Sequence, residues 1–225
     1  MKTSQQLLSL LLLTGLQAPL LAADNAGGAL VTKVQGKVTI NGNSRTEPQL
    51  PPFYRLRQED RLELAEGASL QLVILQNGRQ ENWRGPLRLE MGNAASRCQP
   101  APCQAEIRQL PPAVLSALTR TPNVLNDIRN RSGMVMVRGV GRSEQIQEMN
   151  DAYRQLRTQA DKDDITPELY LLTRLYQLRQ YKEMRKLLED MKARQPDNPE
   201  VIAAQKQFNA QLQDMENRRK ARSND

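Results

Sequence analysis

The sequence predicts an α+β multidomain protein, with a small all-β sandwich toward the N-terminus and an α-helical hairpin bundle toward the C-terminus. Two observations support this class. Between residues 29 and 92, short runs of alternating apolar and polar residues are separated by glycine-containing turns, which is typical of a β sandwich or barrel. From Glu144 onward, apolar residues recur every three or four positions, which is typical of amphipathic helices.

Residues 1–23 have the layout of a cleavable secretory signal peptide. A positive start at Lys2 precedes the leucine-rich stretch from Leu7 to Leu16, and the small residues Ala22 and Ala23 follow. The apolar stretch is interrupted by polar residues, glycine and proline, and no later segment approaches the roughly 20 apolar residues of a membrane span. We therefore expect cleavage after Ala22 or Ala23, export to the periplasm and no membrane span in the mature protein.

The charge balance points to anionic partners. The chain has a net charge of +7, and removal of Lys2 with the signal leaves +6. A basic exported protein meets anionic cell-wall polymers, lipid headgroups and acidic protein surfaces. Nucleic acid is not expected, because aromatic residues make up only 4% of the chain and no basic stretch is interleaved with stacking side chains.

Enzyme activity is not expected. The chain contains no histidine, which excludes Ser-His, Cys-His and His-metal arrangements and removes the commonest general base. Carboxylate-pair, Ser-Lys and cofactor chemistries stay formally open, but no motif indicates them. The acidic run from Asp161 to Asp164 lacks the alternating oxygen ligands and glycine of a calcium loop, so we expect a solvated connection. We expect no cofactor and no metal site.

The β region, residues 29–92, contains five well-marked alternating runs. Tight turns are expected at Asn41-Gly42 and at Asn77-Gly78, since Asn-Gly favours the backbone of a hairpin turn. The sole tryptophan, Trp83, lies in a strand, and we expect it to be buried. The five runs cover residues 30–34, 38–40, 61–64, 69–75 and 87–91.

Several glycine and strand signatures in this region resemble the FecR-type periplasmic domain. They are the V-x-G-x-V pattern at Val34–Val38, the G-x-x-a-x-L strand at Gly67–Leu72 and the turn at Asn77-Gly78. The sequence departs from the family's G-D pair, which is Glu59-Asp60 here, and from its D-G turn. The resemblance covers about a quarter of the chain and implies a module that senses or docks other envelope proteins. An anti-sigma role is not implied, because the founding type's membrane span and cytoplasmic regulator have no counterpart here.

Residues 93–142 read as a connecting segment. Cys98 and Cys103 are the only cysteines, and in an exported protein so close a pair predicts a disulfide. A redox centre and a metal site are less favoured, since redox motifs place two residues between their cysteines and a metal needs more ligands. Short helices are expected from Leu110-Pro111-Pro112 and from Pro122, and a strand at Met134–Val137.

That strand leads into a Gly139-Val140-Gly141 turn and a helix with Ser143 as its N-cap. The turn could cradle a phosphate beside Arg138 and Arg142, but it lacks the third glycine of a dinucleotide fingerprint and the Gly-Lys-Ser/Thr of a P-loop. We favour a plain turn.

The helical region, residues 143–220, is followed by a short tail, 221–225. Thr166-Pro167 predicts a helix start, with Thr166 as the cap. Residues 169–199 resemble one tetratricopeptide repeat, with departures at Leu172 and Met184, where that repeat has small residues. The helix before this unit and the one from Pro199 to about Arg219 are expected to complete the bundle, unless a partner does so. The resemblance rests on Leu171, Leu175, Tyr181, Leu188, Met191 and Pro196.

The repeat resemblance implies a concave face that carries Leu169, Thr173, Tyr176 and Gln177 as binding residues. We expect a non-enzymatic exported envelope protein that acts as a protein–protein interaction or scaffolding module, with another envelope protein as its partner. The alternative is binding of anionic cell-wall or surface polysaccharide. It ranks second, because carbohydrate-binding proteins present exposed aromatic rings to sugars and Trp83 is expected to be buried.

Overall fold

The computed structural model describes residues 28–42, 45–47, 49–121 and 142–223. The expected signal peptide, the helix expected from Pro122, the strand at Met134–Val137 and the Gly139–Gly141 turn all lie outside these residues. The described part contains two antiparallel sheets followed by helices, so the mixed α+β class is confirmed.

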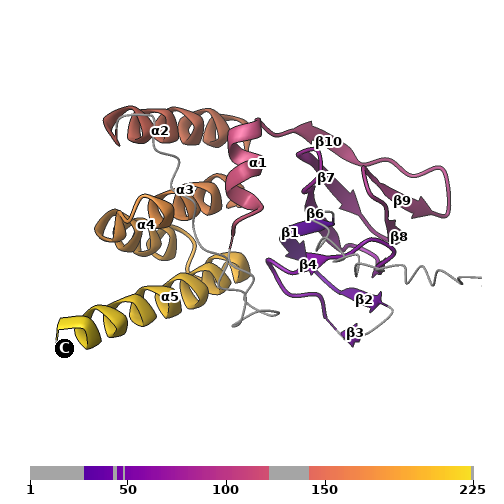
Figure 1. Cartoon of the computed structure of the whole chain (residues 1–225). Helices are drawn as coiled ribbons and strands as arrows, with labels where there is room; N and C mark the ends of the chain where they lie inside the picture. Colours follow the sequence, from indigo (N-terminus) through magenta and orange to yellow (C-terminus); the bar gives the residue numbers. More distant parts are fainter. Residues whose placement is uncertain (1–27, 43–44, 48, 122–141, 224–225) are drawn as a thin grey trace, which may run out of the picture.

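Two five-stranded antiparallel sheets form the N-terminal part (Figure 1). Sheet A has the strand order β10-β7-β6-β1-β4, and sheet B has the order β3-β2-β5-β8-β9. The strands of sheet A are β1 (Ala29–Gln35), β4 (Arg55–Leu56), β6 (Ser69–Ile74), β7 (Arg79–Arg84) and β10 (Glu106–Gln109). Those of sheet B are β2 (Val38–Gly42), β3 (Arg45–Glu47), β5 (Arg61–Leu64), β8 (Leu87–Met91) and β9 (Ser96–Gln99).

The alternation seen in the sequence produces the core between the sheets. In β5 and β8 every second residue is buried, so that one row of side chains faces sheet A while the other faces solvent. Gly36 lies between β1 and β2 with φ +73°, and a Cβ there would come within 3.0 Å of Ala68. Apolar residues from both sheets, such as Val31, Leu62 and Leu89, share one buried cluster.

The β part extends past the boundary expected at residue 92. β9 pairs with β8, and β10 pairs with β7, so the sheets continue to Gln109. The tight turn expected at Asn41-Gly42 is also wrong, because both residues lie in β2 and pair with β3. Cys98 lies in β9 and is joined to Cys103 by the expected disulfide.

Five helices are described after the sheets: α1 (Pro112–Leu118), α2 (Arg142–Gln159), α3 (Thr166–Gln177), α4 (Tyr181–Arg194) and α5 (Pro199–Ser223). The short helix expected after Leu110 is α1, and α3 begins at the predicted Thr166. α2 begins one residue before the predicted cap Ser143, and α5 continues three residues into the predicted tail. α2, α3, α4 and α5 pack side by side in chain order, and α1 packs on α3.

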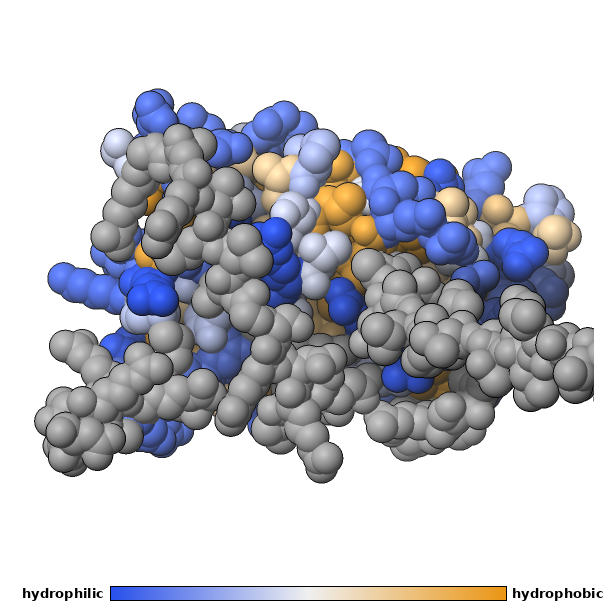
Figure 2. Space-filling view, viewed as in Figure 1, coloured by the Kyte–Doolittle hydropathy of each residue, from blue (hydrophilic) through white to orange (hydrophobic). Residues whose placement is uncertain are grey.

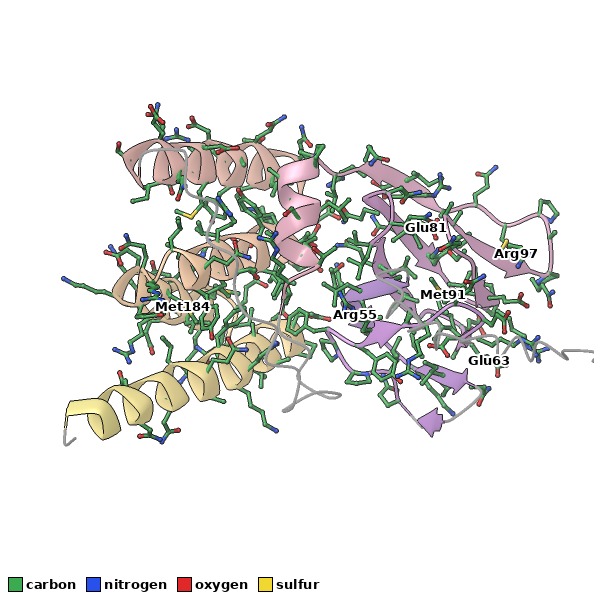
Figure 3. All side chains as sticks on the ribbon, in the orientation of Figure 1. Arg55, Glu63, Glu81, Met91, Arg97 and Met184 are labelled. Carbon is green, nitrogen blue, oxygen red and sulfur yellow. A yellow bond between two sulfur atoms is a disulfide. The ribbon has the colours of Figure 1, made fainter. Side chains whose placement is uncertain are left out.

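The helices cover the face of sheet A that points away from sheet B, which makes three layers (Figure 1). Leu30, Val73 and Leu75 of the β part share one buried cluster with residues of all five helices. Figure 3 shows Met184 inside the helical layer and Arg55 on the side of the sandwich that faces the helices. The two parts therefore share an apolar core, rather than each having a separate one. No helix in the described ranges is long and apolar enough to cross a membrane.

Candidate functional site

A buried polar contact, here called the junction, joins sheet A to the start of α3. The side-chain amide of Gln71, in β6, lies 2.9 Å from Thr32 Oγ1, 3.1 Å from Asp164 Oδ1 and 2.9 Å from Thr166 Oγ1. Asp164 is only 3% exposed, so the expectation that the whole acidic run is solvated is wrong at this residue. Its carboxylate also accepts the Thr166 backbone N–H at 2.8 Å. The N-cap position is Ile165 and Thr166 is the first residue of α3, so the expectation that Thr166 caps this helix is wrong.

Two further acidic side chains, Asp163 and Glu200, connect the helical part to β1. Lys33 Nζ donates to Asp163 at 2.6 Å, and this interaction holds the pKa of the Asp163 carboxyl below its usual value. Glu200, in the first turn of α5, accepts the Val34 backbone N–H at 2.7 Å. Because β4 pairs only with Ala29 and Leu30, the later part of β1 has a sheet edge that Glu200 covers. Glu200 is 2% exposed, and burial raises the pKa of its carboxyl.

Glu168 connects α2 to α3 close to the junction. It is buried in α3, where it accepts the Tyr153 hydroxyl at 3.0 Å and pairs with Arg157 at 3.0 Å. Both partners come from α2. Burial is the main cause that raises the pKa of the Tyr153 phenol, with the nearby Glu168 carboxylate adding to it. The sheet ends of α2, α3 and α5 are therefore held by hydrogen-bonded charged groups.

Two of the four predicted binding residues lie inside the protein. Leu169 is fully buried and Thr173 is 2% exposed. α1 packs on α3 with Val114, Ala117 and Leu118 buried, and just after α1 the Thr121 hydroxyl lies 3.1 Å from that of Thr173. This part of the predicted concave face is occupied by the chain itself. A partner cannot reach Leu169 or Thr173 without displacing these contacts.

The other two predicted residues, Tyr176 and Gln177, lie at the end of α3 that points away from sheet A, and both are half-buried. The Tyr176 ring packs edge-to-face on Tyr181, the first residue of α4, with ring centroids 6.3 Å apart. Burial raises the pKa of the Tyr181 phenol. The structure therefore separates the predicted set into a covered pair and a pair that reaches the surface.

Buried polar atoms without a hydrogen-bond partner are concentrated in the helices α3, α4 and α5. In the described part of the chain, five residues have a buried side-chain polar atom with no hydrogen-bond partner, and four of them come from α3, α4 and α5. The four are Gln177, Tyr181, Gln207 and Gln211. With Tyr176 they are here called the distal cluster. Buried polar groups are normally paired, so such a concentration distinguishes this region from the rest of the protein.

Gln177 of α3 and Gln211 of α5 lie equally far along their helices from the contacts with sheet A. Gln177 lies eleven residues after Thr166, and Gln211 lies eleven residues after Glu200, where each helix touches sheet A. Eleven residues correspond to about 16 Å of helix. Gln207 and Gln211 were not predicted from the sequence, although their spacing from Glu200 places them on one face of α5. The signal available in the sequence was the row of polar residues on the face of α5 beside Ala204, which is buried.

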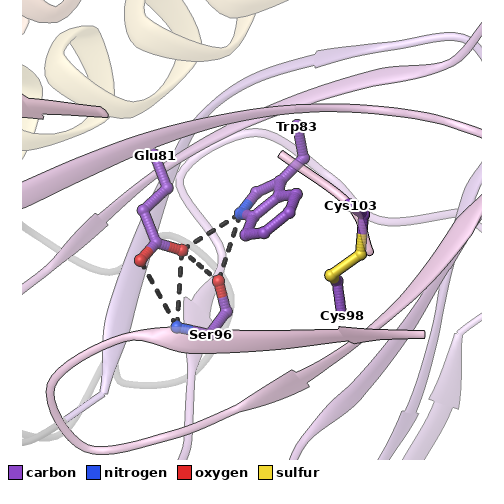
Figure 4. Close-up of a disulfide and its surroundings, with 5 residues drawn as sticks. All are labelled: Glu81, Trp83, Ser96, Cys98 and Cys103. Carbon is purple, nitrogen blue, oxygen red and sulfur yellow. Dashed lines mark hydrogen bonds between the residues drawn. A yellow bond between two sulfur atoms is a disulfide. The ribbon is translucent and has the colours of Figure 1, made fainter. Parts of the chain in front are cut away.

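The sandwich also holds a buried charged cluster, whose groups pair with one another (Figure 4). Glu81 is fully buried; it pairs with Arg79 at 2.7 Å, accepts the Trp83 indole N–H at 3.0 Å and contacts the Ser96 hydroxyl. Trp83 is buried as expected, so its ring does not offer a platform to a sugar. The Cys98–Cys103 disulfide is partly buried against the apolar core between the two sheets.

The visible surface is mostly hydrophilic over the helices, whereas apolar side chains gather where α1 meets the sandwich (Figure 2). Within the described ranges, no group of three or more Cys, Asp or Glu side chains is placed to hold a metal ion. Comparison with models of protein families, with curated protein sequences and with solved structures finds no match to this chain. The FecR and tetratricopeptide resemblances therefore stay predictions.

Proposed function

We propose that this chain is a non-enzymatic exported protein of the cell envelope that binds another envelope protein through the distal cluster. The observation that carries the proposal is the concentration of unpaired buried polar atoms in the helices α3, α4 and α5, on Gln177, Tyr181, Gln207 and Gln211. These atoms are buried and unpaired in the free protein, which costs free energy. Gln177 and Gln211 are half-buried as whole residues, so their side chains can turn outward and pair with a partner, whereas Gln207 is only 4% exposed and stays inside.

The chemistry of the cluster favours a protein partner. A carboxamide both donates and accepts hydrogen bonds, as a peptide group does, so Gln177 and Gln211 can pair with the main chain of a bound segment. The Tyr176 and Tyr181 rings add a rigid aromatic surface of the kind that contributes strongly to protein interfaces. This arrangement supports the docking role that both family resemblances imply.

The junction supports the scaffolding part of the proposal. Gln71, Asp164 and Glu200 hold the helices in one orientation on sheet A through buried hydrogen bonds. A binding surface on rigid elements loses less entropy when its partner arrives. The disulfide and the signal-like N-terminal sequence support export to the periplasm, where disulfides persist.

The test is capture of envelope proteins by the immobilised mature protein, compared between variants. Gln177→Ala combined with Gln211→Ala removes two half-buried carboxamides and is expected to weaken capture of the partner about tenfold or more, as loss of hot-spot contacts does. Arg88→Ala, on an exposed position of β8 in sheet B, is the matched control and should leave capture unchanged. Equal capture by the double variant and the wild type would overturn the proposal.

A further inference from the structure

Strand β10 forms an edge of sheet A. It pairs with β7 on one side, and within the described residues no strand pairs with its other side. Figure 1 shows this outer edge at the border of the molecule, just before α1. Three of its four residues are exposed, including Ile107, which is 51% exposed. An open edge with an exposed apolar residue is a template for pairing with another strand.

The hydrogen bonds to β7 determine which groups of β10 point outward. The Leu110 backbone N–H donates to the Gly78 carbonyl at 2.9 Å, so the pair Leu110 and Gly78 is hydrogen-bonded. In an antiparallel ladder such pairs alternate, which places the backbone groups of Glu106 and Arg108 toward β7 as well. The N–H and C=O groups of Ile107 and Gln109 therefore point away from the sheet.

The edge is held in a fixed conformation at both ends. Before it, the disulfide joins Cys103 to Cys98 of β9, in the other sheet. After it, Leu110 is buried and α1 begins within three residues. A strand that is already ordered loses little conformational entropy when another strand pairs with it.

We propose that a second copy of this chain pairs with the outer edge of β10, antiparallel about a twofold axis at Ile107. In this register Ile107 faces Ile107 of the other copy as a hydrogen-bonded pair, which uses the outward groups identified above. The two A sheets then form one continuous ten-stranded sheet. A twofold contact of this kind closes on itself and gives a dimer rather than a fibre.

The charges on β10 select this register. With the axis at Ile107, Glu106 of each copy faces Arg108 of the other, so two opposite-charge pairs form across the contact. An axis at Glu106 would place two glutamates opposite each other, and an axis at Arg108 would place two arginines opposite each other. Glu106 and Arg108 already lie 3.6 Å apart within one chain, on the same face of the strand. The pattern is therefore self-complementary in one register only.

The experiment measures the oligomeric state of the mature protein by sedimentation equilibrium at concentrations up to about 300 μM, since contacts at the small end of the size range are weak. A monomer–dimer equilibrium is expected. Glu106→Arg, at an exposed position, turns both charge pairs into like-charge pairs and should weaken dimerisation about tenfold or more. Arg108→Glu should have the same effect.

The decisive variant combines Glu106→Arg with Arg108→Glu, because exchange of the charges restores opposite pairs across the axis and should restore dimerisation. Ile107→Pro removes an outward N–H while leaving the ladder to β7, so it should abolish the dimer. Arg88→Glu on sheet B is the control, and thermal melts followed by circular dichroism check folding. A monomer at the highest concentration, or an exchange variant that dimerises no better than the single variants, would overturn the proposal.

Discussion

Gln71 illustrates how one buried polar residue among the apolar residues of β6 joins the two parts of the protein. Its neighbours on the same face of sheet A, such as Val73, pack against the helices. Its amide reaches the side chains that begin α3, at Asp164 and Thr166. A polar residue in such a position stabilises one orientation of the layers, since other orientations would leave it buried without partners.

Replacing Gln71 with leucine keeps the volume and removes the amide. Asp164 would then lose a donor while its carboxylate stays buried, so we expect the free energy of unfolding to fall by about 1–3 kcal/mol. Urea denaturation measures this change. Gln76→Leu, at an exposed position just after β6, is the matched control and should change stability by less than about 0.5 kcal/mol. Equal stability of the two variants would show that the junction contributes little.

The raised pKa of Glu200 predicts that folding stability depends on pH with a sign opposite to that of most carboxyl groups. Its folded pKa is raised by burial, so the native state binds its proton more tightly than the unfolded chain. The stability that Glu200 contributes is present at pH values below its ordinary pKa, near 4.5, and is lost as the pH rises through the raised pKa of the folded state. The groups that face it are the Val34 N–H, Lys33 and Asp163.

Glu200→Gln keeps an acceptor for Val34 and cannot ionise. The free energy of unfolding of both proteins is measured across the acid and neutral pH range. The wild type should lose stability relative to the variant as the pH rises above the ordinary pKa of glutamate. Asp163 acts at lower pH with the opposite sign, because its pKa is lowered and its contribution is lost on acidification. Parallel profiles for the two proteins would contradict the assignment to Glu200.

The secondary-structure elements show where sequence patterns were sufficient. Strands with one buried row, such as β5 and β8, and the helices α3 to α5 were predicted, because one face of each packs on the core. β9 and β10 were missed because their residues are mostly polar and lie at sheet edges, so no clear alternation marks them. Each is positioned by pairing with a strand that precedes it, which is tertiary information.

The candidate site was predicted only in part, for a related reason. Periodicity shows that α3 has apolar and small residues at Leu169 and Thr173, but it does not show which neighbour covers them. That neighbour is α1, about 50 residues earlier in the chain. Gln207 was missed because a glutamine in a helix normally indicates a solvated position, and its burial depends on packing against other helices.

The disulfide lies where the chain passes from sheet B to sheet A. Cys98 belongs to β9 in sheet B, and Cys103 precedes β10 in sheet A, so the bond fixes the connection between the two edge strands. Replacing both cysteines with serine should lower the free energy of unfolding by about 2 kcal/mol, the value expected for so short a loop. Thermal denaturation without reductant measures it. Unchanged stability would show that the edge strands are held by pairing alone.

At the scale of the whole molecule, the three layers form one body because sheet A is covered on both faces. One face packs on sheet B through the sandwich core, and the other packs on the helices through the second core. Buried hydrogen bonds at Gln71, Asp164 and Glu200 connect the same layers. A distal cluster held on such a body keeps a fixed position relative to the sandwich, as the proposed scaffolding role requires.

The sandwich and the helices are expected to unfold as one cooperative unit, and the protein's own spectroscopic reporters test this. Trp83 is the only tryptophan and lies inside the sandwich, so its fluorescence follows the β part, whereas far-UV circular dichroism is dominated by the helices. Urea unfolding of the mature protein, followed by both signals in the same samples, is predicted to give coincident transitions with one midpoint. Helices that unfold at a lower urea concentration than the Trp83 signal would contradict the shared core and the fixed position of the distal cluster.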